Sequence, residues 1–127
     1  KGGFYMAPTI IEDARPSDAI SRDELFGPIT CLYRVKDFTE AVELVNDSPF
    51  GLTAAIHTKN MHRAMTFMNE VKTGVISING ATYGSEPHMP FGGLGQSGTG
   101  WREAGTEALD VYSDWKTVYI VHDPTDV

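Results

Sequence analysis

The stretch FGGLGQSGTGWREAG, residues 91–105, contains the most conspicuous chemical motif of the chain. Gly93, Gly95 and Gly98 match the G-x-G-x-x-G fingerprint, whose glycines let the backbone approach the pyrophosphate of a dinucleotide. A working fingerprint follows a strand and begins a helix within a βαβ unit. Here the glycines follow SEPHMP, whose two prolines argue against a strand. The pattern therefore favours tight turns and close backbone packing over a nucleotide site.

Two further residues could take part in chemistry, a lone cysteine and a histidine beside an acid. Cys31 is the single cysteine and lies in the apolar stretch ITCLYRV, where a buried thiol without a cationic neighbour stays protonated and inert. His88 follows Glu86, but no second ligand pair has a metal-binding spacing such as H-E-x-x-H. The sequence predicts neither a nucleophile at Cys31 nor a metal site.

Composition narrows the class of protein. A net charge of −7 disfavours nucleic acid and anionic membranes as partners, because both attract basic surfaces. No apolar run approaches the roughly 18 residues of a membrane-spanning helix. One cysteine rules out an internal disulfide framework and fits a reducing compartment, so we expect a cytoplasmic location or an organelle matrix.

Hydrophobic periodicity predicts the elements that position these residues. Residues 29–35, 52–58 and 74–79 are typical of strands, and helices follow the first two, capped by Asp37 and Asn60. Strand, helix, strand, helix, strand in about 50 residues indicates right-handed crossovers. The predicted fold class is therefore α/β, with a strand-helix-strand-helix-strand parallel sheet.

The second predicted helix repeats apolar residues at helical spacing. Met61, Ala64, Met65 and Met68 are expected to pack in the core rather than to bind a cofactor.

The last third of the chain changes character. A glycine-rich loop of about 21 residues follows Asn79, and connections of that length are usually functional. Residues 101–112 predict a short helix, and KTVYIV, residues 116–121, predicts a terminal edge strand open to pairing with another chain.

Several segments, in order and spacing, resemble the aldehyde dehydrogenase superfamily. MPFGGLGQSGTGWREAG is similar to the family's P-F-G-G-x-x-x-S-G-x-G-R-E-x-G signature. The other matching segments are SRDELFGP (21–28), NDSPFGLTAAIHTKN (46–60), GVISIN (74–79) and YSDWKTVYI (112–120). The resemblance extends from Gly3 to Val121.

The resemblance implies an NAD or NADP cofactor. In the family, hydride passes from a thiohemiacetal on a cysteine to the nicotinamide, and water then hydrolyses the thioester. Glu24 matches the carboxylate that binds the nicotinamide-ribose hydroxyls, and Phe26 matches the aromatic residue near the nicotinamide. From the residues alone, Glu24 with Asp23 could be a solvated acidic pair, and Phe26 could be a core anchor.

The resemblance also assigns an aldehyde passage. Phe91 matches a ring on the wall of that passage, and Ser85, Glu86 and His88 lie on the loop that lines it. From the residues alone, Phe91 could equally be a core residue. The loop and the C-terminal segments are most similar to relatives acting on semialdehydes.

The family's nucleophile, general-base glutamate and phosphate-binding helix all precede the segment that contains Glu24. The resemblance therefore implies that residues 1–107 are the C-terminal portion of a catalytic domain, and that residues 108–127 are a helix end and an oligomerisation strand and tail. The start at Lys1 without Met agrees with a piece of a longer protein. We expect this chain alone to be inactive and its parent to form homo-oligomers through residues 116–121.

Two departures from the family pattern affect details. Gly95 stands where the family often has Lys, and Trp101 is an extra residue before Arg102. If Arg102 matches across that insertion, we expect it to pair with Asp114.

A second function class stays open on the sequence. The chain could be a non-catalytic α/β interaction module that pairs through residues 116–121. In an enzyme, Glu24, Phe26 and Phe91 should line one open concavity, whereas a module does not require this.

Overall fold

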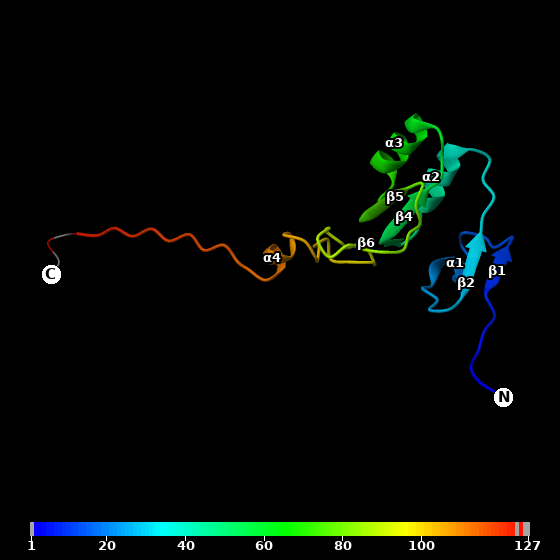
Figure 1. The fold of residues 1–127 in the computed structure, drawn as a ribbon, viewed down its shortest axis with the longest axis horizontal. Coiled ribbons are helices and arrows are strands. Elements are labelled where there is room, and N and C mark those ends of the chain that lie inside the picture. The colour runs from blue at the N-terminus through cyan, green and yellow to red at the C-terminus, as the bar shows by residue number, and fades with distance from the viewer. Residues whose placement is uncertain (1, 124, 126–127) are drawn as a thin grey trace.

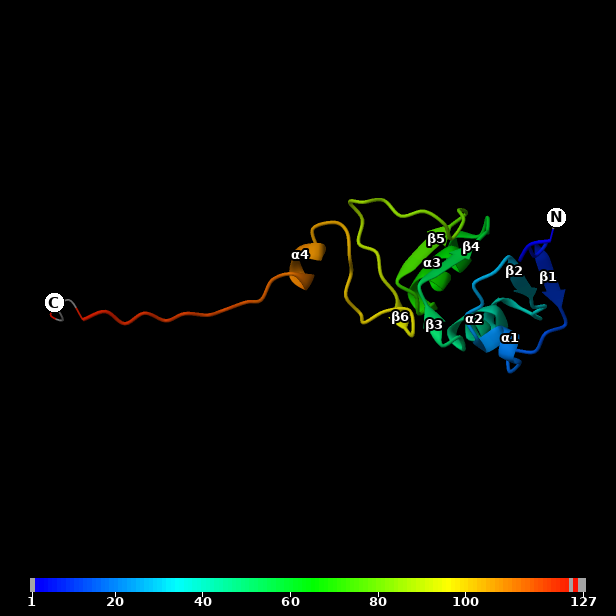
Figure 2. The same ribbon diagram turned by 90° about the horizontal axis from the view of Figure 1, so that it is seen from below.

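The computed structural model describes residues 2–123 and 125. Short elements follow one another along the chain (Figures 1 and 2). They are β1 (Thr9–Glu12), α1 (Ala19–Arg22), β2 (Ile29–Leu32), α2 (Phe38–Asn46), β3 (Phe50–Gly51), β4 (Thr53–Ile56), α3 (Met61–Glu70), β5 (Val75–Ile78), β6 (Leu94–Gly95) and α4 (Ala108–Val111). In both views the chain from 112 to 123, after α4, runs away from the other elements.

The strands form three pairs. β1 pairs with β2 in parallel, β4 with β5 in parallel, and β3 with β6 antiparallel. The predicted α/β class and the order of strands and helices are confirmed. The prediction of one sheet is corrected, because β2 pairs with β1, which the sequence analysis did not identify as a strand, and not with β4.

Both predicted helix caps are present. The Asp37 carboxylate accepts a hydrogen bond of 2.9 Å from the Glu40 backbone N–H, and the Asn60 side chain accepts one of 3.2 Å from the Arg63 N–H. The Glu40 carboxylate in turn accepts from the Lys36 N–H at 2.6 Å. These bonds satisfy N–H groups at the helix starts that have no partner within the helix.

The core lies between the two longer helices and the β4–β5 pair. Its buried residues are Val42, Ala54, Phe67 and Val71. Phe38, Ile56 and Ile76 pack against them.

The core face of α3 differs from the prediction. Ala64 is buried as expected, but Met61, Met65 and Met68 are 74%, 45% and 42% exposed. Instead of these methionines, Phe67 is the large α3 side chain that is buried in the core, with 6% of its surface exposed. The methionines form a neighbouring stripe with the same helical spacing, so periodicity alone could not decide which stripe faces the sheet.

β2 is covered on one face only. Ile29 and Cys31 are half-buried, whereas Thr30 and Leu32 are exposed. The predicted strand position of Cys31 is confirmed, but the predicted full burial is wrong, because β1 and β2 form a two-stranded sheet with one open face.

The predicted terminal strand is not formed within the described chain. Residues 116–121 have no strand partner there, and Val118, Tyr119, Ile120 and Val121 are 65–97% exposed. A strand requires a partner for its backbone groups, and none of the described residues supplies one. Over the same described range, no helix combines the length and apolarity needed to cross a membrane.

Candidate functional site

The segment between α1 and β2 carries the predicted cofactor residues. Glu24 is exposed, and Phe26 is 94% exposed. Among the described residues, the Glu24 carboxylate has neither an ion-pair partner nor a hydrogen-bond partner. The Gly27 N–H donates to the carbonyl of Leu25 at 3.0 Å, which makes a tight turn just after Phe26. Glu24 is therefore an unengaged carboxylate on a short exposed turn.

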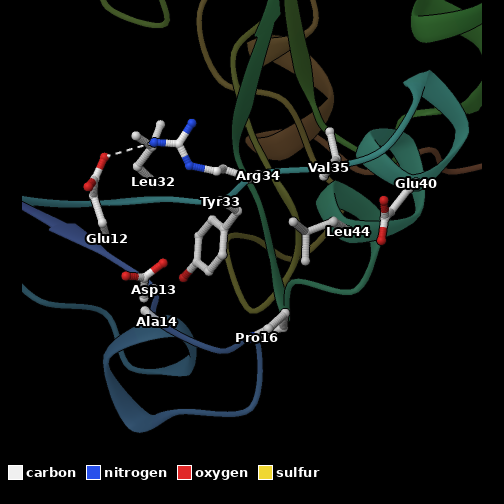
Figure 3. Close-up of a pocket in the computed structure, with 10 residues that line it drawn as sticks. All are labelled: Glu12, Asp13, Ala14, Pro16, Leu32, Tyr33, Arg34, Val35, Glu40 and Leu44. Atoms are coloured by element: carbon white, nitrogen blue, oxygen red, sulfur yellow. Dashed lines mark hydrogen bonds and ion pairs between the residues drawn. The ribbon is translucent and has the colours of Figure 1, made fainter.

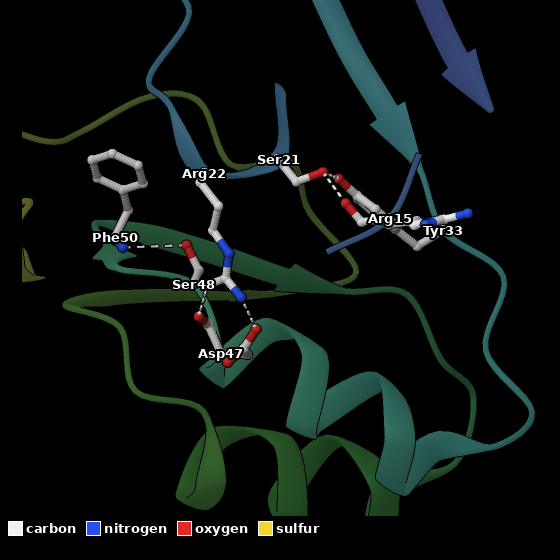
Figure 4. Close-up of polar contacts among 7 residues, drawn as sticks. All are labelled: Arg15, Ser21, Arg22, Tyr33, Asp47, Ser48 and Phe50. Atoms are coloured by element: carbon white, nitrogen blue, oxygen red, sulfur yellow. Dashed lines mark hydrogen bonds and ion pairs between the residues drawn. The ribbon is translucent and has the colours of Figure 1, made fainter. Parts of the chain in front are cut away.

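Hydrogen bonds fix the helix that precedes this turn. The Tyr33 hydroxyl donates to the Ser21 hydroxyl at 2.6 Å, and Ser21 donates to the Arg15 carbonyl at 2.7 Å (Figure 4). On the other side, the Arg22 guanidinium donates to both the carboxylate and the backbone carbonyl of Asp47. These contacts hold α1 between β2 and the end of α2.

The end of α2 is itself joined to α3. The Asn46 side chain donates to the Glu70 carbonyl at 2.9 Å and accepts from the Lys72 N–H at 2.8 Å. Asn46 therefore satisfies two backbone groups at the C-terminal end of α3. No periodicity in the sequence predicts this contact, because the partners lie 24 and 26 residues away.

The glycine-rich segment packs against the chain that follows α2. β6 pairs with β3, the Gln96 N–H donates to the Pro49 carbonyl at 2.9 Å, and the Gly51 N–H donates to the Ser97 hydroxyl at 3.2 Å. The next helix in the described chain, α4, begins only at Ala108. The segment is thus a strand and a turn, which contradicts the dinucleotide fingerprint and agrees with its rejection from the sequence.

Several of these glycines allow backbones to touch. A methyl group on Gly74 would overlap the carbonyl of Gly92, and one on Gly98 would lie 2.7 Å from the carbonyl oxygen of Gly93. Gly95 has a φ of 58°, a left-handed conformation that favours glycine. The predicted role in close packing and turns is confirmed.

The loop with the predicted substrate residues begins at the carboxyl ends of β4 and β5. Asn79, with φ 59°, follows β5 and accepts through its side chain from the Thr58 N–H at 2.8 Å. Ligands of α/β proteins bind at the carboxyl ends of parallel strands. Ser85, Glu86 and His88 lie exposed on this loop.

The loop returns by pairing Phe91 with Glu103. Each residue's N–H donates to the other's carbonyl at 2.8 Å, and the Gly105 N–H donates to the Pro87 carbonyl at 3.1 Å. Phe91 lines a cavity of about 370 Å³ together with glycine-rich residues, Trp101 and Val111. This volume lies within the range of small-molecule sites.

The structure brings only some of the predicted residues together. Ser85, Glu86, His88 and Phe91 share one loop, but of these only Phe91 lines the 370 Å³ cavity. Glu24 and Phe26 do not line it either. The convergence of Glu24, Phe26 and Phe91 expected for an enzyme is therefore not made by that cavity.

Arg102 is not paired as predicted. It donates to the carbonyls of Gly100 at 3.0 Å and Trp101 at 3.3 Å, and the ion pairs of the described residues do not include Asp114. Asp114 lies beyond α4 and lines a hollow together with Trp101, but its carboxylate forms no ion pair with Arg102 among the described residues.

A second cavity, of about 320 Å³, lies beside β2 and α2 (Figure 3). Its walls include Glu12, Arg34 and Glu40, but none of the predicted site residues. Glu12 and Arg34 form an ion pair of 3.4 Å, and Glu40 caps α2, so these side chains already have structural partners. Over residues 2–123 and 125, no cluster of three or more His, Cys, Asp or Glu could hold a metal ion.

Comparison with known proteins gives consistent matches. A model of the aldehyde dehydrogenase family matches residues 1–118. The α-ketoglutarate semialdehyde dehydrogenase of Haloferax volcanii is 41% identical over 118 residues, 92% of this chain and 24% of that protein. The benzaldehyde dehydrogenase of Bacillus subtilis is 38% identical over 125 residues, 96% of this chain and 26% of that protein.

A solved structure shows the same fold. The crystal structure of an NAD-dependent aldehyde dehydrogenase from Sinorhizobium meliloti has a TM-score of 0.84 and 33% identity, covering 97% of this chain and 25% of that one. The chain thus spans about a quarter of the length of the relatives that it matches.

Proposed function

This chain belongs to the aldehyde dehydrogenase family, and from that premise we propose that it works as the C-terminal portion of an enzyme that oxidises an aldehyde to a carboxylate with NAD or NADP. The observation that carries the proposal is the family match over residues 1–118. The exposed and unengaged Glu24, which we propose as the ribose-binding carboxylate, supports it. The two parts of the site, the turn after α1 and the loop after β5, have separate tasks.

Glu24 fits a ribose-binding role by its chemistry. A carboxylate offers two acceptor oxygens, and a ribose presents two adjacent hydroxyl donors. Because Glu24 has no competing partner among the described residues, both oxygens are open to these donors. The exposed ring of Phe26 lies two residues away and provides an apolar surface for the nicotinamide end.

A dinucleotide, when bound, would supply the hydride acceptor. The residues of this chain bind and orient the cofactor and line the aldehyde passage. Glu24 holds the ribose, and the loop with Ser85, Glu86 and His88 lines the aldehyde passage with Phe91 as part of its wall. We propose that Cys31 takes no part, because it is a half-buried residue within β2 and the family's nucleophile precedes the segment that contains Glu24. We therefore assign no catalytic nucleophile to these 127 residues and propose that the chain alone is inactive.

The substrate class is proposed from the residues of the loop and from the relatives. The Haloferax volcanii relative is named for a semialdehyde and the Bacillus subtilis relative for benzaldehyde. A semialdehyde carries a second polar group, and His88 on the exposed loop offers a hydrogen-bond donor for it. We propose a semialdehyde substrate and action in the cytoplasm.

Self-association is proposed through residues 116–121. Their apolar side chains, from Val118 to Val121, are 65–97% exposed, and their backbone has no strand partner in the described chain. An extended segment of this kind can add as a strand to the sheet of a second copy.

Formation of NADH or NADPH on aldehyde addition tests the enzymatic proposal. The full gene product containing these residues is assayed with each nucleotide and with a panel of semialdehydes and benzaldehyde. Reduction of at least one nucleotide supports the proposal. Oligomerisation without reduction of either nucleotide by any aldehyde contradicts it, and favours a non-catalytic module that pairs through residues 116–121.

A further inference from the structure

The turn that carries Glu24 has few anchors of its own. Between Asp23 and Gly27, the backbone hydrogen bonds of the turn reach Ala19, Leu25 and Ile29, which are all local partners. The next long-range bond is made at Pro28, whose carbonyl accepts from the Thr9 N–H at 2.8 Å. The position of Glu24 therefore depends on how firmly the chain is held on both sides of the turn, at Pro28 after it and at α1 before it.

Before the turn, α1 is held by the bonds of Ser21 to Tyr33 and Arg15 on one side and by Arg22 on the other. One nitrogen of the Arg22 guanidinium donates to the Asp47 carboxylate, and the other donates to the Asp47 carbonyl at 2.6 Å (Figure 4). Asp47 is the C-cap of α2, and its own N–H donates to the Glu43 carbonyl at 3.0 Å. A cation at this helix end is favoured by the unpaired carbonyls and by the helix dipole.

The contact between Arg22 and Asp47 also connects to the backbone that supports the glycine-rich segment. Asp47 is followed by Ser48, whose hydroxyl accepts from the Phe50 N–H at 3.2 Å. Phe50 begins β3, which pairs with β6 in the glycine-rich segment. Arg22 thus joins the turn with Glu24 to the same backbone that supports the segment with Phe91.

We propose that Arg22 is a positioning residue, which holds Glu24 at a fixed place relative to the glycine-rich segment through its paired hydrogen bonds to Asp47. The inference rests on the proposed cofactor role of Glu24. The Arg22 and Asp47 side chains are 37% and 57% exposed, and exposed ion pairs contribute little to stability. Loss of Arg22 should therefore alter the turn more than the fold.

The test compares Arg22→Gln with Arg34→Gln in the full gene product. Arg34 is a matched control, because it also pairs with an acid, Glu12, at 3.4 Å but lies after β2, away from the turn. Affinity for NADH is measured by fluorescence titration. Amide hydrogen exchange of residues 23–28 is measured in the cofactor-free protein, with α3 as the internal reference. Arg22→Lys tests whether charge without the planar fork is sufficient.

We expect Arg22→Gln to weaken NADH binding by about threefold to tenfold, with Arg34→Gln within about twofold of the unchanged protein. Exchange of residues 23–28 should become faster in Arg22→Gln, and exchange in α3 should not change. NADH binding and exchange in Arg22→Lys should lie closer to those of Arg22→Gln than to those of the unchanged protein, because a compact ammonium lacks the two separated nitrogens with which the planar guanidinium reaches both acceptors.

Two outcomes overturn the inference. One is NADH affinity in Arg22→Gln equal to that in Arg34→Gln; the other is weaker binding with unchanged exchange of residues 23–28. Should Arg22→Gln fail to fold, Asp47→Ala is measured in its place, because it removes the side-chain acceptor and keeps the backbone carbonyl of residue 47. Unchanged NADH binding and unchanged exchange in that variant likewise refute the inference. Glu24→Gln separates the two proposals. Unchanged NADH affinity in Glu24→Gln refutes the cofactor role of Glu24. Weakened NADH affinity in Glu24→Gln, together with unchanged affinity in Arg22→Gln, refutes only the positioning role of Arg22.

Discussion

Replacement of Asn46 by alanine should lower the free energy of unfolding by about 1–2 kcal/mol. Asn46 donates to the Glu70 carbonyl at 2.9 Å and accepts from the Lys72 N–H at 2.8 Å. A net contribution of about 1 kcal/mol for each hydrogen bond gives about 2 kcal/mol. Alanine is the better helix former at the last position of α2, which returns about 0.5 kcal/mol.

Asn69→Ala is the matched control. Asn69 lies in the last turn of α3, is exposed, and makes no side-chain hydrogen bond among the described residues. The same gain in helix propensity should make this variant equally stable or slightly more stable. The difference between the two variants, about 2 kcal/mol, therefore isolates the two bonds of Asn46.

Urea unfolding with linear extrapolation measures both variants, and amide hydrogen exchange at Lys72 gives a local measurement. We expect a lower urea midpoint for Asn46→Ala at unchanged slope and faster exchange of the Lys72 amide. Equal stability of Asn46→Ala and Asn69→Ala, with unchanged exchange at Lys72, would refute the assignment of these bonds as the link between α2 and α3.

Two further predictions concern other parts of the chain. Gly74→Ala should destabilise the protein by about 1–3 kcal/mol, because the added methyl group overlaps the Gly92 carbonyl, and a urea midpoint unchanged from the parent would contradict this contact. The pKa of Asp123 is lowered, first by the hydrogen bond from the Thr125 hydroxyl and then by that from its backbone N–H. Because the folded-state pKa is the lower one, any stability from this contact is present above the ordinary aspartate pKa and is lost as the pH falls through the lowered value. NMR titration should show the Asp123 pKa rising in Thr125→Ala, and an identical titration curve would argue against the hydroxyl bond.

Local signals predicted much of this fold. Asp37 and Asn60 cap the helices as expected, since a cap depends on residues three positions apart. The methionine stripe of α3 was the wrong face, because two neighbouring stripes share the same spacing and only packing against β4 and β5 chooses between them. β1 was not predicted, because its four residues after a proline are too few to show hydrophobic periodicity, and because the strand forms only by pairing with β2.

Less of the candidate site than of the fold could be predicted from the residues alone. The glycines of residues 91–98 indicated close packing from the residues alone, and the structure has it. The roles of Glu24 and Phe91 came from family resemblance and stay proposals. The contact between Arg22 and Asp47 had no signal in the sequence, because the arginine at the end of α1 and the acid at the end of α2 lie 25 positions apart.

The most direct test of the central proposal is the KM for NAD or NADP in Glu24→Gln, measured beside Asp23→Asn in the full gene product. Both residues are exposed neighbours on the same turn, and both substitutions remove one negative charge. Loss of a charged acceptor for two ribose hydroxyls should raise the KM by about tenfold or more in Glu24→Gln alone. Equal KM values in the two variants would contradict the account, because a solvated acidic pair predicts no difference between them.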